Sequence, residues 1–565
     1  MRYFVAGSLF LAVLAQADRS VTTKIPDTTP DDAFEVPSDF FGFGWESGLV
    51  PHYNDQVSDI SVRAVKVIGK NMDKDPVIRI GGTSGDHIYY KPDQKAAATC
   101  DSGSRCRKNS KDVFYIGPSY FDTLSLFKKS TTSSMTIQAP MGPHMPVNYS
   151  LAYVQEAYKA LGADRVAAIA LGNEPNWYND TNGQHISAQE YVDQAVKLKA
   201  ELIDMLKAKP STMTTIPFGC KFTSTKRWLI AITYKTKSTE VVNQGIKENG
   251  GAKYAAEHYY QLTDSYHDKS KYTPEMLGEK LMNHDSIKNQ LKHYTKDVAF
   301  LRKNNLSLTI SEVGSALGIS PPWFGAGFGA AIWAVDFHLA AMAGGVSQIC
   351  NTQEPAATHS FWVPDNTGNN NTYGPAVQGV FVAAAFITDF VGKTGSLGKV
   401  HEIGPFDDGR VTGYVSYSLE SSKPQRIALV NMKEYNEDSG DTREKASVTL
   451  DVGDFKSAKV RRMTSKFGSP ARGFDLGGEK EVVTHAGQQY SYAKNKLVDP
   501  YPTKPTEESE TVDDGKLTVS LQDTEAVVIE LQGKATNGAN VVAPNSASYS
   551  VFYFALFYLC YHYVL

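Results

Sequence analysis

The sequence has little cysteine and no excess of charge of either sign. Five of its 565 residues are cysteine, and its 57 basic and 61 acidic residues nearly cancel, to a net charge of -4. No CxxC pair or histidine cluster provides the spacing of metal ligands, and no long basic run occurs. We therefore expect no metal site and no nucleic-acid partner.

The chain also lacks an internal repeat of fixed period, although it is long. Its residues are 41% hydrophobic, which allows a large core in a chain longer than one compact unit usually is. We expect two folded domains between two ends that are not part of the fold.

Residues 1–17, MRYFVAGSLFLAVLAQA, are typical of a secretory signal peptide. One arginine precedes an apolar stretch, and Ala15-Gln16-Ala17 has the small residues of a cleavage site before Asp18. The alternative is an N-terminal membrane helix, but the apolar stretch is shorter than a bilayer span. The sequence therefore predicts a secreted protein.

Residues 538–565 have the pattern of a GPI-attachment signal. Small residues are followed by a polar spacer over 540–550 and an apolar tail over 551–565, in the order that this signal requires. We expect attachment at Asn537, with Asn540, Ser546 and Ala547 as alternatives. The expected location is the cell surface or cell wall, on the outer face of the membrane through a lipid anchor.

Sequons and cysteines agree with an oxidising, secretory route. Four Asn-X-Ser/Thr sequons predict glycan acceptors, at Asn148, Asn179, Asn305 and Asn370. Cys100 and Cys106 bracket a short polar loop and are expected to form a local disulfide. Cys220 and Cys350 lie in strand-like runs, where free thiols and a bond are equally compatible with the sequence.

Short apolar runs alternate with helical patterns over residues 36–375. Eight runs are expected to be strands, at 40–47, 76–82, 134–140, 166–174, 216–222, 253–260, 306–313 and 346–352. Helix signals lie between them: a possible N-cap at Ser150 with a stop at Gly162, and a capping box from Ser187 to Glu190. This alternation predicts an α/β fold, a (β/α)8 TIM barrel.

Residues 376–535 have a different pattern of short alternating strands separated by turn residues. This pattern is typical of a C-terminal antiparallel β-sandwich domain, to which residues 18–35 are a candidate addition. The acidic, proline-containing stretch 499–515 is expected to be a solvated loop.

Two glutamates stand at strand ends of the predicted barrel. Glu174 ends the fourth run and Glu312 the seventh, at the barrel end where chemistry is located, and Pro175 biases Glu174 away from the helical region. Barrel dimensions place the two backbones roughly 14 Å apart, which leaves about 5–6 Å between the carboxyl groups. That separation favours a retaining glycosidase over an inverting one, and this chemistry requires no cofactor.

The segments ALGNEPNWY and ISEVGSALGIS, with VIRIGGTSGD and EHYYQ, resemble glycoside hydrolase family 79 in sequence and order. The resemblance covers residues 36–395 and implies that Glu174 is the acid/base and Glu312 the nucleophile. It further implies that Asn173 binds near the sugar 2-hydroxyl and that Tyr259 or Tyr260, with Tyr259 preferred, supports the nucleophile. Further substrate contacts are implied at Glu46, Thr83, Asp86 and Gly318.

Two features depart from the family pattern. The loop after Glu312 lacks the tyrosine that is usual there, and Phe361 and Trp362 stand where another tyrosine is common; His359 or Ser360 could replace its hydroxyl. The resemblance implies release of β-linked glucuronic acid, or its 4-O-methyl form, from a glycan. The alternatives are another exo or endo specificity on cell-wall polysaccharide, and a catalytically silent glycan-binding surface protein.

Overall fold

The computed structural model describes most of the chain between the two ends. The described residues are 20–53, 56–100, 113–142, 145–178, 185–207, 212–215, 238–246, 252–262, 272–317, 320–355, 358–364, 374–393 and 398–533. The expected signal peptide, the GPI signal with Asn537, and residues Cys106, Asn179, Cys220, Gly318 and Asn370 lie outside them.

Eight parallel strands close a barrel in which spatial order follows chain order. They are β3 (Phe41–Glu46), β4 (Val77–Gly81), β8 (Met135–Ala139), β9 (Val166–Leu171), β10 (Thr212–Thr215), β11 (Ala252–Leu262), β12 (Ser307–Ala316) and β13 (Gln348–Thr352). Seven coincide with expected runs. The expected strand at 216–222 lies outside the described residues, and Thr212–Thr215 takes the fifth position between β9 and β11.

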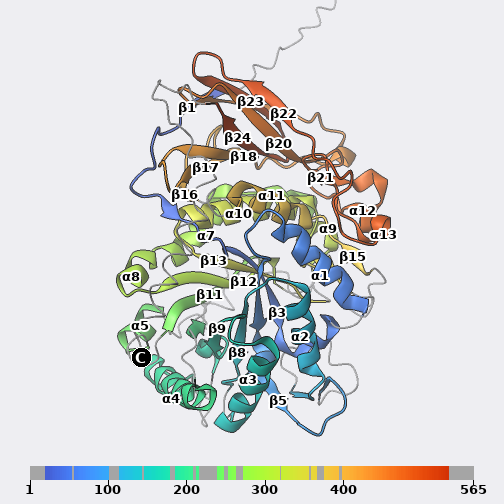
Figure 1. Cartoon of the computed structure of the whole chain (residues 1–565). Coiled ribbons are helices and arrows are strands. Elements are labelled where there is room, and N and C mark those ends of the chain that lie inside the picture. The colour runs from blue at the N-terminus through green and yellow to red at the C-terminus, as the bar shows by residue number, and fades with distance from the viewer. Residues whose placement is uncertain are drawn as a thin grey trace, which may run out of the picture.

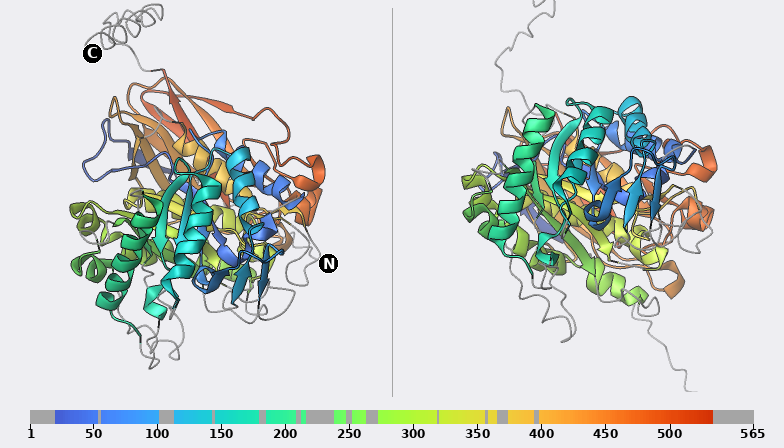
Figure 2. Two further views of the ribbon diagram at one scale, coloured as in Figure 1. Left: turned by 60° about the horizontal axis from the view of Figure 1, so that its bottom comes forward. Right: turned by 90° about the horizontal axis from the view of Figure 1, so that it is seen from below.

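Helices surround these strands when the molecule is viewed from below (Figure 2). The longer ones are α1 (Gln56–Gly69), α2 (Tyr120–Ser130), α3 (Val147–Leu161), α4 (Ala188–Leu206), α5 (Ser238–Asn243), α7 (His284–Thr295), α8 (Val298–Lys303), α10 (Phe328–Ala343) and α11 (Phe381–Val391). The predicted capping box of α4 is confirmed. Helix α3 ends at Gly162 as expected, but it begins after Pro146, so Ser150 is not its N-cap. The Ser150 hydroxyl instead donates to the Pro140 carbonyl.

Short elements fill the connections at the carboxyl end of the barrel. A small sheet after β4 contains β5 (Ile88–Tyr90), β6 (Ala98–Cys100) and β7 (Phe114–Ile116), and a second pairs β14 (Trp362–Val363) with β15 (Ala376–Val377). Single turns are η1 (Ser47–Tyr53), η2 (Thr83–His87), η3 (Pro175–Trp177), α6 (Pro274–Met276), η6 (Leu277–Leu281) and α9 (Pro322–Gly325). Cys100 in β6 is disulfide-bonded, whereas Cys350 in β13 is a buried free thiol.

The C-terminal region is rich in β-structure and contains two sheets. The larger runs in the order β2 (Phe34–Glu35), β16 (Gly398–Glu402), β17 (Val411–Ser418), β18 (Pro424–Asn431), β24 (Glu525–Gln532), β20 (Ser457–Ser465) and β21 (Val483–His485), with β22 (Glu508–Thr511) also on β20. The smaller contains β1 (Ser20–Lys24), β19 (Lys445–Asp451) and β23 (Lys516–Gln522). Minor elements are η7 (Glu437–Ser439), α12 (Phe474–Gly477), η8 (Glu479–Glu481) and α13 (Tyr492–Asn495).

Apolar residues of the two sheets, such as Val415, Leu450 and Val527, meet in a second core. The sheets are antiparallel except where β1 runs parallel to β19. The stretch 499–515 is exposed or half-buried throughout, as expected of a solvated segment, but Glu508–Thr511 is a strand on β20 rather than part of a loop, and the Glu508 carboxylate binds the Arg462 guanidinium. The α/β class with a sheet-rich C-terminal region is confirmed.

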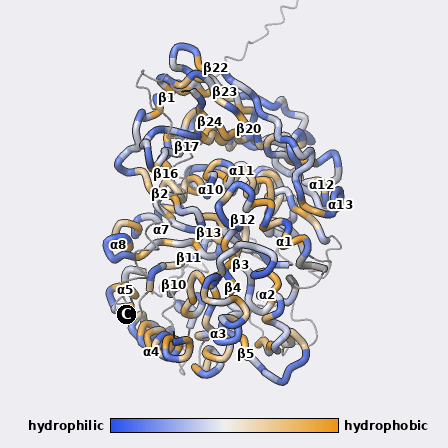
Figure 3. The backbone as a smooth tube through the Cα atoms, in the orientation of Figure 1, coloured by the Kyte–Doolittle hydropathy of each residue, from blue (hydrophilic) through white to orange (hydrophobic). Residues whose placement is uncertain are grey.

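Helices α10 and α11 lie between the barrel and the C-terminal sheets (Figure 1). Figure 3 colours the backbone of these two helices largely as hydrophobic. Every residue of α10 from Phe328 to Met342 is buried. The segment Pro322–Ala343 is long and apolar enough to cross a membrane, yet it is almost entirely buried within the protein. A helix covered on all sides has no polar face, which explains its nearly uniform apolar sequence.

One polar network lies within this apolar layer and joins the two domains. The Asp336 carboxylate of α10 accepts hydrogen bonds from Thr412 Oγ1 at 2.6 Å and Tyr414 Oη at 2.7 Å, both on β17. His284 of α7 lies between Asp336, at 2.8 Å, and Glu402 of β16, at 3.1 Å. Burial alone would lower the pKa of His284, but Asp336 and Glu402 raise it to about 10.

We predict that His284→Ala destabilises the fold by about 3–5 kcal/mol, because it leaves the Asp336 carboxylate buried without its cation. The raised pKa means that the His284 contribution is fully present below pH about 6.5 and is lost as pH rises towards 10. The melting-temperature gap between wild type and variant should therefore shrink over this range. The control is His401→Ala, whose partner Asp32 is 76% exposed; a gap that is constant with pH would contradict the prediction.

Candidate active site

The first carboxylate, Glu174, follows β9 on a constrained turn. Gly172 has φ +73°, and a Cβ there would lie 2.5 Å from the Tyr178 hydroxyl, so a side chain does not fit. Glu174 has φ 49° and ψ 55°. It is outside the right-handed helical region, as expected, but it is left-handed rather than extended. An observed backbone conformation of this kind in a residue other than glycine points to a functional constraint.

The second carboxylate, Glu312, lies within β12 and accepts two side-chain hydrogen bonds. Arg79 Nη1 donates to its Oε2 at 3.2 Å, and Tyr260 Oη donates to its Oε1 at 2.6 Å. Strand register shifts beside it on both sides, between Glu257 and His258 of β11 and between Ile310 and Val313 of β12. Such irregularities re-aim side chains, and they are common next to active sites.

His258 connects the two carboxylates. Its Nδ1 lies 2.8 Å from Glu174 Oε1 and 3.5 Å from Glu312 Oε2. The greatest possible separation of those two oxygens is therefore 6.3 Å, the sum of 2.8 and 3.5 Å. The structure thus brings together two acids that are far apart in the chain.

Electrostatic surroundings hold Glu312 in its charged form. Burial by itself would raise the pKa of Glu312, but the charges of His258 and Arg79 and the Tyr260 hydrogen bond lower it below the ordinary value. A carboxylate that stays ionised in an acidic medium is suited to act as a nucleophile.

Arg79 also positions Asn173, because its Nη2 donates to Asn173 Oδ1 at 2.7 Å. The Asn173 backbone N–H is held by Asp86 Oδ2 at 3.1 Å and by the Tyr178 hydroxyl at 2.9 Å. Asp86 is 4% exposed and accepts further hydrogen bonds from Tyr178, Gln138 and Met141. The prediction that Asp86 contacts substrate is therefore wrong: its oxygens are occupied by the protein, and it positions the turn that carries Glu174.

Two more carboxyl groups face the Glu312 side of the site. Glu46 ends β3 and accepts a hydrogen bond from Ser84 N at 2.5 Å; Glu354 follows β13. Because Gly44 pairs with Thr352, the two glutamates stand at the same level on neighbouring strands. Burial, with the charges of Glu354 and Glu312, raises the pKa of Glu46 to about 8. Burial and the Glu312 charge raise that of Glu354 to about 7.

The preference for Tyr259 over Tyr260 is wrong. The Tyr259 hydroxyl donates to Gln261 Oε1 at 2.5 Å, away from Glu312, whereas Tyr260 donates to Glu312 and lies 3.2 Å from Thr352 Oγ1. Thr83 begins η2 and is half-buried, next to Gly82, which approaches the Glu46 carboxylate.

The aromatic segment after β13 is directed into the core. Trp362 is fully buried and donates from Nε1 to Ser61 Oγ, and Phe361 packs on Phe43. His359 remains close to the site, with its ring 5.9 Å from that of Tyr260. Of the sequons that the structure describes, Asn148 and Asn305 are exposed.

Sequence reasoning missed Arg79, His258, Glu354 and Tyr178. Arg79 is the one charged residue in the apolar run VIRIG, which is a signal of a buried partner. His258 lies in EHYYQ, two residues before Tyr260 and hence on the same strand face. Within the described part of the chain, no group of three His, Cys, Asp or Glu side chains could hold a metal ion.

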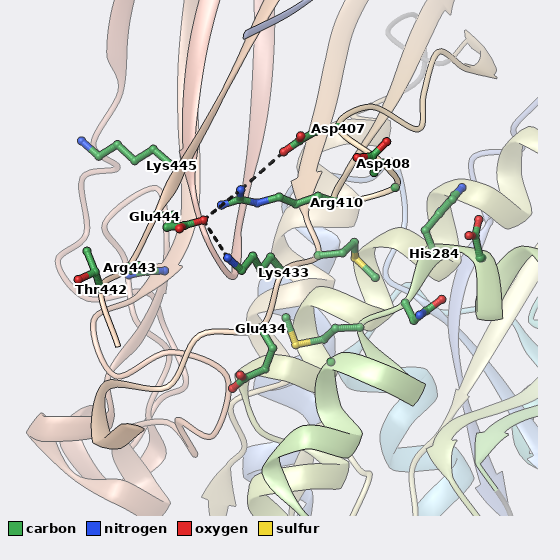
Figure 4. Close-up of a pocket in the computed structure, with 16 residues that line it drawn as sticks. His284, Asp407, Asp408, Arg410, Lys433, Glu434, Thr442, Arg443, Glu444 and Lys445 are labelled. Atoms are coloured by element: carbon green, nitrogen blue, oxygen red, sulfur yellow. Dashed lines mark hydrogen bonds and ion pairs between the residues drawn. The ribbon is translucent and has the colours of Figure 1, made fainter. Parts of the chain in front are cut away.

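A separate cavity of about 910 Å³ lies between the C-terminal domain and the barrel helices near His284 (Figure 4). Several of its charged groups pair with one another: Arg410 lies 3.4 Å and Lys433 2.8 Å from Glu444. It contains neither Glu174 nor Glu312, so we assign it to the domain interface.

The chain thus combines a closed parallel barrel, a glutamate after its fourth strand, a glutamate within its seventh strand and a β-rich C-terminal region. Residues 413–528 match the glycosyl hydrolase family 79 C-terminal beta domain. The resemblance of the chain to glycoside hydrolase family 79 is thereby confirmed.

Curated relatives agree with this family. The beta-glucuronidase of Neurospora crassa is 22% identical over 455 residues, which cover 76% of this chain and 78% of the relative. The beta-glucuronidase of Aspergillus niger is 23% identical over 439 residues, which cover 75% and 76%. Both of these similar proteins carry the name beta-glucuronidase.

Solved structures agree in fold. A 4-O-alpha-L-rhamnosyl-beta-D-glucuronidase from Fusarium oxysporum 12S superposes with a TM-score of 0.71 at 22% identity, covering 90% of this chain and 100% of that one. A GH51 arabinofuranosidase from Xanthomonas axonopodis pv. citri gives a TM-score of 0.56 at 14% identity, covering 91% and 99%.

We predict that Tyr260→Phe raises the pKa of Glu312, because it removes a hydrogen bond that lowers it. The acidic limb of the pH profile of kcat/KM should move to higher pH, and kcat should fall roughly tenfold. Tyr259→Phe is the matched control: it removes an equally buried hydroxyl that does not touch Glu312. Identical acidic limbs in the two variants would refute the assigned support role.

Proposed function

We propose that the protein is a retaining glycoside hydrolase that releases β-linked glucuronic acid, or its 4-O-methyl form, from glycans. The observation that carries the proposal is the convergence of Glu174 and Glu312 on one imidazole, that of His258, at the carboxyl end of the barrel. The names of the curated relatives support glucuronic acid as the released sugar. The GH79 C-terminal domain match supports the reaction class, and we extend the architecture to a (β/α)8 barrel with a β-sandwich.

The proposed reaction has two steps. Glu312 attacks the anomeric carbon and forms a glycosyl ester, while Glu174 gives its proton to the departing glycosidic oxygen. Glu174 then takes a proton from water, and the resulting hydroxide displaces Glu312 with a second inversion. Retaining enzymes hold the two carboxyl groups about 5–5.5 Å apart and inverting ones about 6.5–9.5 Å; the 6.3 Å limit applies to the two oxygens that face His258, and it is compatible with retention.

The remaining residues are proposed to bind the sugar. Arg79 donates a hydrogen bond to the side-chain amide oxygen of Asn173. The side-chain N–H groups of Asn173 are therefore the ones available to the sugar 2-hydroxyl. Glu46 has a pKa of about 8 and therefore carries a proton in acid, so that it can donate as well as accept a hydrogen bond. Thr83 and the backbone of Gly318 complete the proposed contacts.

A neutral β-glycoside is the second candidate substrate, and the carboxyl groups of Glu46 and Glu354 favour it. A glucuronate needs a cation or free N–H groups at its own carboxylate. Among the described residues of the site, Arg79 is engaged with Glu312 and Asn173, and His258 with the two catalytic acids. A panel of nitrophenyl glycosides that includes the β-glucuronide distinguishes the two candidates.

We predict that Glu312→Gln abolishes turnover, because the nucleophile is removed. Glu174→Ala should slow hydrolysis of an unactivated disaccharide by about 10²–10⁴-fold and that of a nitrophenyl glycoside much less, since nitrophenolate leaves without protonation. Proton NMR of the first product should show the β anomer. Glu156→Gln, at a half-buried position of α3 where Glu156 pairs with Lys159, is the control; an α product, or full activity of Glu312→Gln, would overturn the proposal.

The protein is further proposed to be secreted and held at the cell surface by a GPI anchor at Asn537, with glycans on its sequons. We predict that phosphatidylinositol-specific phospholipase C releases the full-length protein from intact cells, because this enzyme cuts the anchor. A variant that ends at residue 533 should appear in the medium without treatment. Two outcomes would contradict the anchor: the protein made from the full-length sequence is found entirely in the medium, or the truncated variant stays on the cells.

A further inference from the structure

Trp177 is unusually exposed for a tryptophan. Its exposed fraction is 46%, whereas Trp45, Trp333 and Trp362 are at 3% or less. The other large hydrophobic side chains that are exposed in the described ranges, Leu419, Leu497 and Tyr501, belong to the C-terminal domain. Within the described barrel, Trp177 therefore stands alone as a large apolar side chain left in solvent. An exposed aromatic ring in the same turn as the proposed proton donor is a candidate stacking surface for a sugar.

The position of Trp177 is fixed relative to Glu174. The Trp177 backbone N–H donates to the Glu174 carbonyl at 2.9 Å, and both residues belong to the single turn that follows β9. The indole ring meets the His185 ring edge to face, at 6.4 Å between centroids. The next residue, Tyr178, is anchored by its hydroxyl to Asp86 and by its carbonyl to Ile186 N. The ring thus projects from a rigid segment.

We propose that Trp177 is the platform of the leaving-group subsite, on which the pyranose that departs with the glycosidic oxygen stacks. This inference rests on the proposed function, because it takes Glu174 as the proton donor. A general acid must be within hydrogen-bond reach of the oxygen that it protonates. The sugar attached to that oxygen therefore lies close to Glu174, whose turn also carries Trp177. Its C–H face is apolar and matches the indole face.

The chemistry of the platform predicts the class of leaving group. An indole ring has no charge and a single hydrogen-bond donor, so it recognises the shape of a pyranose more than its substituents. The natural substrate is accordingly a glycan in which the released sugar is linked to another pyranose. A small alkyl leaving group would not reach the ring.

The test compares two substrates that share the released sugar and differ in the leaving group. One is the methyl β-glucuronide, and the other is a disaccharide of glucuronic acid β-linked to a neutral pyranose. Trp177→Ala should lower the ratio of kcat/KM for the disaccharide to that for the methyl glycoside roughly tenfold, mainly through KM. Trp177→Phe should retain most of the ratio. Leu419→Ala, which removes an equally exposed side chain, should leave it unchanged.

Each outcome of this test either supports or overturns the proposal. A selective fall in the ratio of kcat/KM for the disaccharide to that for the methyl glycoside supports Trp177 as the platform, and an unchanged ratio overturns it. Equal losses on both substrates also overturn it, because Trp177 would then act only by positioning Glu174. If wild type cleaves a neutral glycoside instead of the glucuronide, the same pair of substrates is made with that sugar. If wild type cleaves no glycoside of the panel, the proposed function fails, and this inference fails with it.

Discussion

The interaction on which the site depends is the contact of one buried guanidinium with groups from two other strands. Arg79 of β4 is 2% exposed and donates to Glu312 of β12 and to Asn173 after β9. A buried charge is expensive unless it is paired and hydrogen-bonded. Arg79 therefore fixes the relative position of the three strand ends, since its burial is tolerable only when its partners stand where they are. The geometry of Glu312 and of Asn173 follows from this constraint.

The same pocket holds acids in opposite protonation states. Glu312 is kept ionised by His258, Arg79 and Tyr260 against the effect of burial. At Glu46, burial and neighbouring carboxylates outweigh the hydrogen bonds from Ser84 and raise the pKa to about 8, and burial with the Glu312 charge raises the pKa of Glu354 to about 7. Environments that push the pKa values of neighbouring acids apart are how a protein divides catalytic roles among chemically identical side chains. The charge of Glu312 itself contributes, because it raises the pKa of both neighbours.

Much of the fold could be predicted from the sequence, because it depends on local patterns. Apolar runs of strand length located seven barrel strands, and Ser187 with Glu190 located the start of α4. The small sheet β5–β7–β6 was not predicted, since strands of three residues have no readable alternation. Asp86 was misjudged because its role depends on Tyr178, Gln138 and Met141, which reach it only in three dimensions.

The tyrosine pair illustrates the limit of periodicity. Alternation correctly implies that one of Tyr259 and Tyr260 faces the site, but it does not say which one. In the structure Tyr260 is the one that faces the site. It shares a strand face with His258, beside which the strand register shifts. His258 matters because it contacts both Glu174 and Glu312, and a single sequence does not show such contacts.

The turn that carries Glu174 shows why residues that do not touch substrate still matter to the reaction. A left-handed backbone at a residue other than glycine costs roughly 1–2 kcal/mol, and Glu174 adopts one. The turn keeps this conformation because its neighbours are fixed on both sides: Asn173 N by Asp86 and Tyr178, and Trp177 N by the Glu174 carbonyl. Gly172 allows Tyr178 to come close enough to do this. The orientation of Glu174, the proposed proton donor, is thus set by a buried network beneath it, and the same turn holds the backbone of Trp177 next to that of Glu174.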